Sequence, residues 1–210
     1  MNVLVVAATE AEVAIFRSRT PACAHILITG VGPIATTWAV TNHLATHQYD
    51  LVIQAGVAGT FHHHLQLGSL VWVIADTYGD LGAEDHDNYL SMFELGLQPK
   101  DDAIHKAGML TAPTADIPVP GGMPQVTGIT VSTVTGSAAT VARRAAMGHC
   151  TESMEGAAFH YVCLKAAVPY VQVRALSNYV TPRDRSSWKM KEAIIALNDW
   201  LIAYTTAICG

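Results

Sequence analysis

Two carboxylates and one amide lie next to apolar runs of the chain, where side chains could do chemistry. Glu12 follows the run "VLVVAA", Glu155 precedes a second apolar run, and Asn178 ends a third. A carboxylate can take up a proton or accept hydroxyl hydrogen bonds, and an amide can donate and accept at once. Each also has a structural interpretation, because Glu12 and Glu155 suit a helix dipole and Asn178 suits a turn. The residues alone leave both interpretations open.

Small-residue segments follow several of the same runs. They are "GVGP" (30–33), "GVAGT" (56–60) and "TGS" (135–137). We expect tight turns there, with or without a ligand. The first segment lacks the third glycine of the dinucleotide fingerprint GxGxxG, so a nicotinamide cofactor is only weakly supported and we expect no cofactor.

Other polar clusters favour surface loops over chemistry. The runs "HHH" (62–64) and "EDHD" (84–87) lack the spaced ligand pattern of a structural zinc site, so we expect no metal. The run "ARRAA" (142–146) suggests an exposed helix end rather than an anion site. The chain has no GxSxG motif, which argues against an esterase.

Apolar runs that resemble strands alternate with helical patterns along the chain. The runs are rich in Val and Ile and mostly do not alternate with polar residues, which is typical of strands covered on both faces. Expected strands are 3–8, 24–30, 51–56, 69–76, 128–134 and 169–177, and expected helices are 9–18, 33–47, 153–167 and 186–208. This order predicts an α/β domain with a largely parallel sheet, whose carboxyl edge gathers the candidate residues. Residues 79–127 are less regular, with a loop expected at 111–125.

Composition narrows the class of protein. The 210 residues predict a single domain, 1–210, and the charged fraction of 14% is below the roughly 25% of an average soluble domain. A net charge of −5 without a basic cluster argues against nucleic acid as a partner. No stretch reaches the roughly 18 apolar residues that a membrane helix needs, so no membrane partner is expected. The chain either has a large core or hides apolar surface in an oligomer.

The spacing of the cysteines indicates whether the protein belongs in a reducing or an oxidising cellular compartment. Cys23, Cys150, Cys163 and Cys209 are widely spaced and form no CxxC pair. We interpret them as reduced thiols of a cytoplasmic protein. The apolar run at the amino terminus has no basic region and meets Glu10 early, so it predicts a core strand rather than a signal peptide.

Several motifs together resemble the nucleoside phosphorylase and nucleosidase superfamily. In order they are "AATEAEV" (7–13), "GVG" (30–32), "GVAG" (56–59), "SMEGAA" (153–158) and "RALSN" (174–178). Within it, "DLGAED" (80–85), "ESMEGAAF" (152–159) and "SNYVTPRDRSSW" (177–188) resemble the futalosine hydrolase family. The resemblance implies a twisted mixed β-sheet flanked by helices, a homodimer or larger assembly, and hydrolysis of a purine N-glycosidic bond. For futalosine, the products would be hypoxanthine and dehypoxanthine futalosine, on a route to menaquinone.

The resemblance also implies roles for individual residues. Glu12 matches the carboxylate that activates the attacking water. Met154 and Glu155 match the pair that lies against the ribose and accepts its hydroxyl hydrogen bonds. Thr133 and Val134 match the segment beside the base.

Two departures from related families carry information. Val57 stands where many phosphorylases and adenine-type nucleosidases have a polar residue, so the turn offers a phosphate only backbone donors and water is the expected nucleophile. Asn178 stands where methylthioadenosine-type nucleosidases have Asp. An amide can donate to O6 of a 6-oxopurine and accept from N7–H as the base leaves, which favours hypoxanthine over adenine.

Futalosine carries a carboxylated tail, and Arg183 or Arg185 could pair with it because Arg suits bidentate carboxylate recognition. A solvated loop is the structural alternative for both. Three other functions stay open: a phosphorolytic 6-oxopurine nucleoside phosphorylase, a methylthioadenosine-type nucleosidase, and a non-catalytic nucleoside-binding protein.

Overall fold

A mixed sheet runs through the molecule, which is described by a computed structural model over residues 1–86, 88–113 and 122–209. The sheet contains β1 (Val3–Ala7), β2 (Ala24–Ile28), β3 (Leu51–Thr60), β4 (Leu70–Tyr78), β7 (His105–Lys106), β8 (Met109–Thr111), β9 (Gln125–Thr130), β10 (Thr151–Ser153) and β11 (Tyr170–Tyr179). A separate hairpin is formed by β5 (Gly82–Asp85) and β6 (Asn88–Ser91). The helices are α1 (Glu10–Arg17), α2 (Pro33–Leu44), α3 (Ala138–Ala145), α4 (Gly156–Ala166) and α5 (Met190–Cys209), with a short 3₁₀ turn at Arg185–Ser187.

The strand pairing curls part of this sheet. β3 pairs with β11, β11 with β4, β4 with β9, β9 with β10, and β10 returns to β3. These five strands therefore close into a ring, while β1 and β2 extend from β3 as parallel neighbours. The pairings are partly parallel and partly antiparallel, so the predicted mixed sheet with flanking helices is confirmed.

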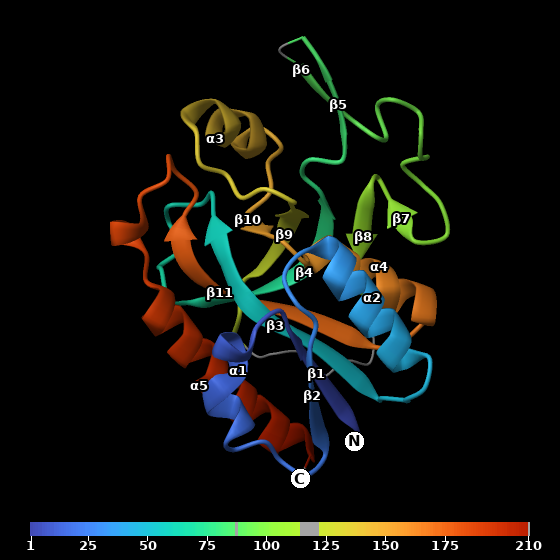
Figure 1. Cartoon of the computed structure of the whole chain (residues 1–210), viewed down its shortest axis with the longest axis vertical. Helices are drawn as coiled ribbons and strands as arrows, with labels where there is room; N and C mark the ends of the chain where they lie inside the picture. Colours follow the sequence, from blue (N-terminus) through green and yellow to red (C-terminus); the bar gives the residue numbers. More distant parts are fainter. Residues whose placement is uncertain (87, 114–121, 210) are drawn as a thin grey trace.

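Helices cover both faces of the sheet, as Figure 1 shows for α1 and α5 on one side and α2 and α4 on the other. Along β1, Val3 and Val5 pack in the cluster that includes Phe16 of α1, while Leu4 and Val6 pack in the cluster that includes Phe159 of α4. Burial on both faces explains why this strand is apolar at every position. None of the described helices is long and apolar enough to cross a membrane.

Several element boundaries differ from those expected, and two of the differences affect the candidate site. The segment 56–60 is not a turn, because β3 continues through it and stays paired with β11 up to Thr60. Conversely β9 ends at Thr130, so Thr133 and Val134 lie in irregular chain beyond the strand. The loop expected at 111–125 lies outside the described residues at 114–121.

The run 142–146 is helical, but the expectation of an exposed helix end was wrong for one of its arginines. Arg143 is 33% exposed, whereas Arg144 is 3% exposed and ion-paired to Glu152 and Asp80. Burial of Arg144 follows from partners on other elements, Glu152 of β10 and Asp80 after β4, which the helical pattern does not contain.

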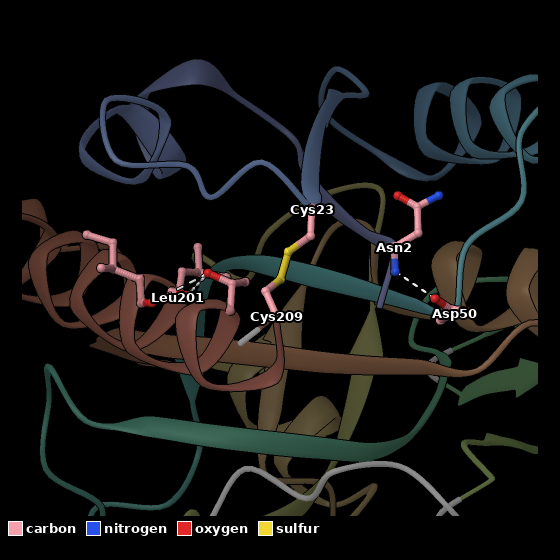
Figure 2. Close-up of a disulfide and its surroundings, with 7 residues drawn as sticks. Asn2, Cys23, Asp50, Leu201 and Cys209 are labelled. Carbon is pink, nitrogen blue, oxygen red and sulfur yellow. Dashed lines mark hydrogen bonds between the residues drawn. A yellow bond between two sulfur atoms is a disulfide. The ribbon is translucent and has the colours of Figure 1, made fainter.

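The interpretation of all four cysteines as reduced thiols was wrong for two of them. Cys23, directly before β2, and Cys209, at the end of α5, form a disulfide (Figure 2), with Cα atoms 6.2 Å apart. They are 186 residues apart in sequence, and only the packing of α5 brings them together. Cys150 and Cys163 are buried free thiols.

Candidate active site

Glu12 lies at the start of α1 and reaches across to β3. Its Oε2 accepts from the amide and hydroxyl of Thr9 at 2.9 and 3.0 Å, so it does complete the helix N-terminus. Its Oε1 accepts from the amide of Val57 at 3.2 Å. The structural interpretation of Glu12 therefore holds, and one carboxylate oxygen is still directed at the central strand with a single donor.

Arg174 connects the other carboxylate to the same place. Its Nη1 donates to Glu155 Oε2 and to the carbonyl of Val57, both at 3.3 Å. Glu155 Oε1 accepts from the amide of Gly32 at 3.1 Å, which ties the "GVGP" segment to the start of α4. We call Glu12, Glu155 and Arg174 the Arg174 cluster. All three are buried, and two carboxylates against one guanidinium leave a net charge of −1.

The glycines of the "GVAG" motif make room for these side chains. A Cβ atom at Gly56 would lie 2.5 Å from Arg174 Nη1 and 3.0 Å from Glu12 Oε1. A Cβ atom at Gly59 would lie 3.1 Å from Asn178 Nδ2. Glycine is therefore required by close approach of side chains from α1 and β11, rather than by a turn.

Arg174 is a candidate site residue that the sequence reasoning did not select. It is 1% exposed, yet Nε and Nη2 have no hydrogen-bond partner among the described residues. Buried donors of this kind are normally satisfied, so they point to a ligand or water in the site. A charged residue inside the apolar run "VQVRALS" was the available signal.

Asn178 lies in strand β11, opposite Gly59 of β3, and not in a turn. Its Oδ1 accepts from the hydroxyl of Ser177 at 2.9 Å, and its Nδ2 donates to the carbonyl of Tyr179 at 3.1 Å. Each end of the amide keeps one further hydrogen-bonding position. The pairing register places it beyond Arg174 on the same strand, toward the carboxyl edge.

The other expected site residues come from two neighbouring segments. Thr133 and Val134 are exposed beyond the end of β9, and half-buried Met154 immediately precedes Glu155. The amide of Val131 donates to the carbonyl of Ser153 at 2.9 Å, so the segment after β9 and the end of β10 are fastened together.

Arg183 and Arg185 are exposed residues of the loop after β11. Their guanidinium carbons lie 5.2 and 5.9 Å from the ring centre of Trp188. The amide of Arg183 donates to the carbonyl of Gly136 at 3.1 Å, which holds the loop against the "TGS" segment. Arg183 thus lies near residues 135–137, and neither arginine forms an ion pair within the described chain.

An apolar cavity of about 520 Å³ is lined by sequence neighbours of Gly32 and Glu155, and not by the three cluster residues themselves. Its lining includes Pro33 next to Gly32, Ser132 after β9, and Ala157 in the first turn of α4. Within the described residues, no group of three or more His, Cys, Asp or Glu side chains could hold a metal. In the 62–64 run, His63 instead stacks on Tyr179 with ring centres 4.6 Å apart.

Comparison with known proteins supports one family. The model of the Phosphorylase superfamily matches residues 13–201. Futalosine hydrolase of Streptomyces coelicolor is 38% identical over 181 residues, covering 83% of this chain and 75% of the relative. Futalosine hydrolase of Acidothermus cellulolyticus is 34% identical over 195 residues, covering 91% and 79%.

Solved structures support the fold. A 5'-methylthioadenosine/S-adenosylhomocysteine nucleosidase from Neisseria meningitidis has a TM-score of 0.82 at 16% identity, covering 98% of this chain and 99% of that one. Futalosine hydrolase of Helicobacter pylori has a TM-score of 0.80 at 14% identity, covering 99% and 98%. The chain therefore belongs to the Phosphorylase superfamily and, within it, to the futalosine hydrolase family.

Proposed function

We propose that this protein hydrolyses the N-glycosidic bond of futalosine and releases hypoxanthine and dehypoxanthine futalosine, a step of the futalosine route to menaquinone. Three relatives that are 30–38% identical over most of the chain carry the name of this activity. The observation that carries the hydrolytic mechanism is the composition of the Arg174 cluster.

The cluster favours water over phosphate as the nucleophile. Two buried carboxylates flank one guanidinium, so a phosphate dianion would enter a site whose net charge is already negative. The Val57 amide, the backbone donor available on β3, already donates to Glu12. A neutral water meets neither obstacle.

Each charged group then has a role in the cleavage. Glu12 Oε1 accepts a proton from the attacking water, because it has a single donor and so keeps a lone pair available. Arg174 Nε or Nη2 donates to the same water and orients it. Glu155 has one protein donor on each oxygen, so both oxygens can also accept ribose hydroxyls and stabilise the positive charge that develops on the sugar.

The base and the remaining sugar contacts follow from the neighbouring segments. Asn178 donates to O6 and accepts from N7–H of the leaving hypoxanthine, while Thr133 and Val134 line the base and Met154 lies against the ribose. Arg183 or Arg185 pairs with the carboxylate of the tail. Val57 contributes through its backbone, by holding Glu12 and Arg174 in place.

The deciding experiment is chromatographic. The enzyme is incubated with futalosine, inosine and methylthioadenosine, each with and without phosphate, and the released bases are separated. Hypoxanthine from futalosine without phosphate supports the proposal. A requirement for phosphate would instead indicate a phosphorylase, and adenine from methylthioadenosine would overturn the role of Asn178. Binding of all three without release of any base would indicate a nucleoside-binding protein.

We also propose a homodimer or larger assembly, formed through an apolar face beside the 520 Å³ cavity. Ile34 and Trp38 of α2 are 86% and 71% exposed, and Leu81 and Tyr161 are 50% and 37% exposed. A second copy of the chain would cover this unusually apolar surface. Light scattering tests the proposal, since Trp38→Glu should yield monomers if this face is the interface.

The cytoplasm is our proposed location for the reaction. Cys150 and Cys163 are free thiols, as in reduced compartments, whereas the Cys23–Cys209 bond is uncommon there. Cell fractionation followed by thiol labelling of the recovered protein tests the location and the redox state of the pair together.

A further inference from the structure

A second buried arginine lies behind the segment that we propose for the base. Arg144 of α3 is 3% exposed. Its Nη1 donates to the carbonyl of Thr133 at 2.8 Å, to Thr135 Oγ1 at 2.7 Å and to Glu152 Oε2 at 2.8 Å. Its Nη2 donates to Asp80 Oδ2 at 3.2 Å. One guanidinium therefore joins α3 to β10, to the chain after β4 and to the chain after β9.

The two carboxylates hold the same segment by its amides. Asp80 Oδ2 accepts from the amides of Ser132 and Thr133 at 2.8 and 3.3 Å. Glu152 Oε1 accepts from the amide of Thr135 at 2.8 Å. The amide of Val134 is the one in this stretch without a partner among the described residues. The backbone is thus fixed from the inside, and Ser132, Thr133 and Val134 are exposed on the outside.

We propose that Arg144, Asp80 and Glu152 are positioning residues for base recognition, and we call them the Arg144 clamp. They hold residues 132–135 in one conformation, which presents Thr133 and Val134 to the purine. The inference rests on the proposed function for its substrate. The clamp acts on the base only through the segment it holds, so it sets base affinity and base selectivity rather than the chemical step.

The clamp also sets the distance between residues 132–135, proposed to contact the base, and Glu155, proposed to contact the ribose. Glu152 lies within β10, three positions before Glu155 at the start of α4, so the two networks are joined by a short stretch of chain. The Val131 amide bonds to the carbonyl of Ser153 at 2.9 Å, beside the clamp. A shift of the clamped segment therefore changes the distance from the base to the ribose carboxylate.

Two substitutions weaken the clamp without removing its charges. Arg144→Lys keeps the positive charge, but a single ammonium nitrogen cannot bond both carboxylates and the Thr133 carbonyl in the planar geometry of a guanidinium. Thr135→Val removes a hydroxyl that bonds both Arg144 and Glu152. Arg143→Lys is the matched control, because Arg143 is on the same helix, is 33% exposed and lies 3.7 Å from Glu84.

The experiment measures base binding apart from catalysis. Product inhibition by hypoxanthine gives Ki, futalosine turnover gives KM and kcat, and hydrogen exchange follows the amides of Ser132, Thr133 and Thr135. We expect Arg144→Lys to raise Ki and KM about ten-fold, the effect of one lost bond to a buried group, with a smaller change in kcat. Thr135→Val should also raise Ki and KM. Amide hydrogen exchange should be faster in both variants, and Arg143→Lys should match the wild type in all three measurements.

Each outcome decides between the two proposals. A wild-type enzyme that releases no hypoxanthine from futalosine overturns the proposed function, and calorimetric binding of hypoxanthine together with amide exchange still tests the clamp. An active wild type whose Arg144→Lys and Thr135→Val variants keep Ki and amide protection overturns the clamp alone. A lower melting temperature with unchanged Ki also overturns it, because the network would then be structural only.

Discussion

The Arg174 cluster and the Arg144 clamp each contain one guanidinium and two carboxylates, and all of these groups are buried except Asp80, which is half-buried. Arg144 makes four hydrogen bonds with both terminal nitrogens, leaving only Nε without a partner. Arg174 makes two, both through Nη1, and leaves Nε and Nη2 without partners in the described chain. The two arginines therefore differ in how many donors remain free: Arg144 is bonded through both terminal nitrogens, which suits a network that holds the fold, whereas Arg174 keeps two donors that a ligand could use.

Neighbouring residues sharpen this difference. The Arg174 cluster lies over Gly56, whose missing side chain leaves room for Arg174 and Glu12. Beside the Arg144 clamp lies the Thr135 side chain, whose hydroxyl bonds both Arg144 and Glu152. Space beside the first arginine is left by a glycine, whereas space beside the second is filled by protein.

Breaking the incomplete network should have the largest effect on turnover. Glu12→Gln keeps the side-chain shape and an oxygen that can accept from Thr9, but the amide cannot take a proton from water. We therefore expect kcat to fall by about 10²–10⁴-fold. Affinity for hypoxanthine should stay unchanged, as measured by calorimetry. Glu10→Gln is the control, because Glu10 is 64% exposed and pairs only with Arg17 on the surface of the same helix. Turnover that survives Glu12→Gln would remove Glu12 as the base.

A pair of glutamates three positions apart tests the comparison directly. Glu155→Gln should lower kcat by about 10²-fold, because it removes charge that faces the developing cation on the sugar. Glu152→Gln should instead destabilise the fold by on the order of 3 kcal/mol, since it breaks a buried ion pair. Glu152 accepts from Thr135 and Arg144, whereas Glu155 accepts from Gly32 and Arg174 and leaves Glu12 nearby to balance Arg174.

Urea unfolding and steady-state kinetics on both variants give the result. The comparison holds if the larger stability loss belongs to Glu152→Gln and the larger kcat loss to Glu155→Gln. Similar losses of both quantities in both variants would mean that the two networks do not differ in function.

Asn178→Asp should change the base that is cleaved. A protonated Asp can donate to N7 and accept from a 6-amino group, so the ratio of kcat/KM for 6-oxo over 6-amino substrates should fall about 10- to 100-fold, equivalent to one or two mismatched polar groups. Competition between futalosine and its 6-amino analogue measures the ratio. Asn178→Ala is the control and should lower both rates without changing the ratio. An unchanged ratio in Asn178→Asp would assign Asn178 to its local bonds with Ser177 and Tyr179 alone.

Sequence patterns predicted the Arg174 cluster better than the clamp, and the reason is physical. Glu12 and Glu155 stand at the starts of helices beside strand ends, so the α/β pattern alone brings them to one edge of the sheet. Arg144 binds Asp80, 64 residues away, and Glu152, eight residues away on a different element, and no helical or strand periodicity encodes these contacts. The "GVAGT" segment misled in the opposite way, because its glycines were interpreted as a turn when they accommodate side chains from β11 and α1.

Asp76 shows what happens to a buried carboxyl that has no arginine bonded to it. It is fully buried, accepts from Thr130 at 2.9 Å and Gln172 at 3.3 Å, and burial raises its pKa from 3.8 to about 6. The folded protein therefore holds a proton that the unfolded chain has released between about pH 4 and pH 6. In that interval the free energy of unfolding should fall as pH rises. Above about pH 6 Asp76 is ionised in both states, so the loss of stability that it causes stays constant.

Asp76→Asn should remove this dependence. Between pH 4 and pH 7 the free energy of unfolding of the wild type should fall by on the order of 2 kcal/mol relative to the variant. This follows from the rise of about two units in the pKa of Asp76. Urea unfolding at several pH values measures it, with Asp199→Asn on the exposed side of α5 as the control. Parallel stability curves for wild type and Asp76→Asn would contradict the buried proton.

Arg183 and Arg185 extend the comparison to arginines that are exposed, and they should give the smallest effect. Both lie beside Trp188 without a carboxylate partner in the described chain, so the tail of futalosine would be their first ion pair. Exposed ion pairs contribute about 0–1 kcal/mol, so Arg183→Ala or Arg185→Ala should raise the KM for futalosine only about two- to five-fold. The increase should shrink at high salt, because exposed charges are screened. Inosine has no such tail and is the matched control substrate: equal increases in KM for inosine and futalosine would show that the loop supports the site without reading the carboxylate.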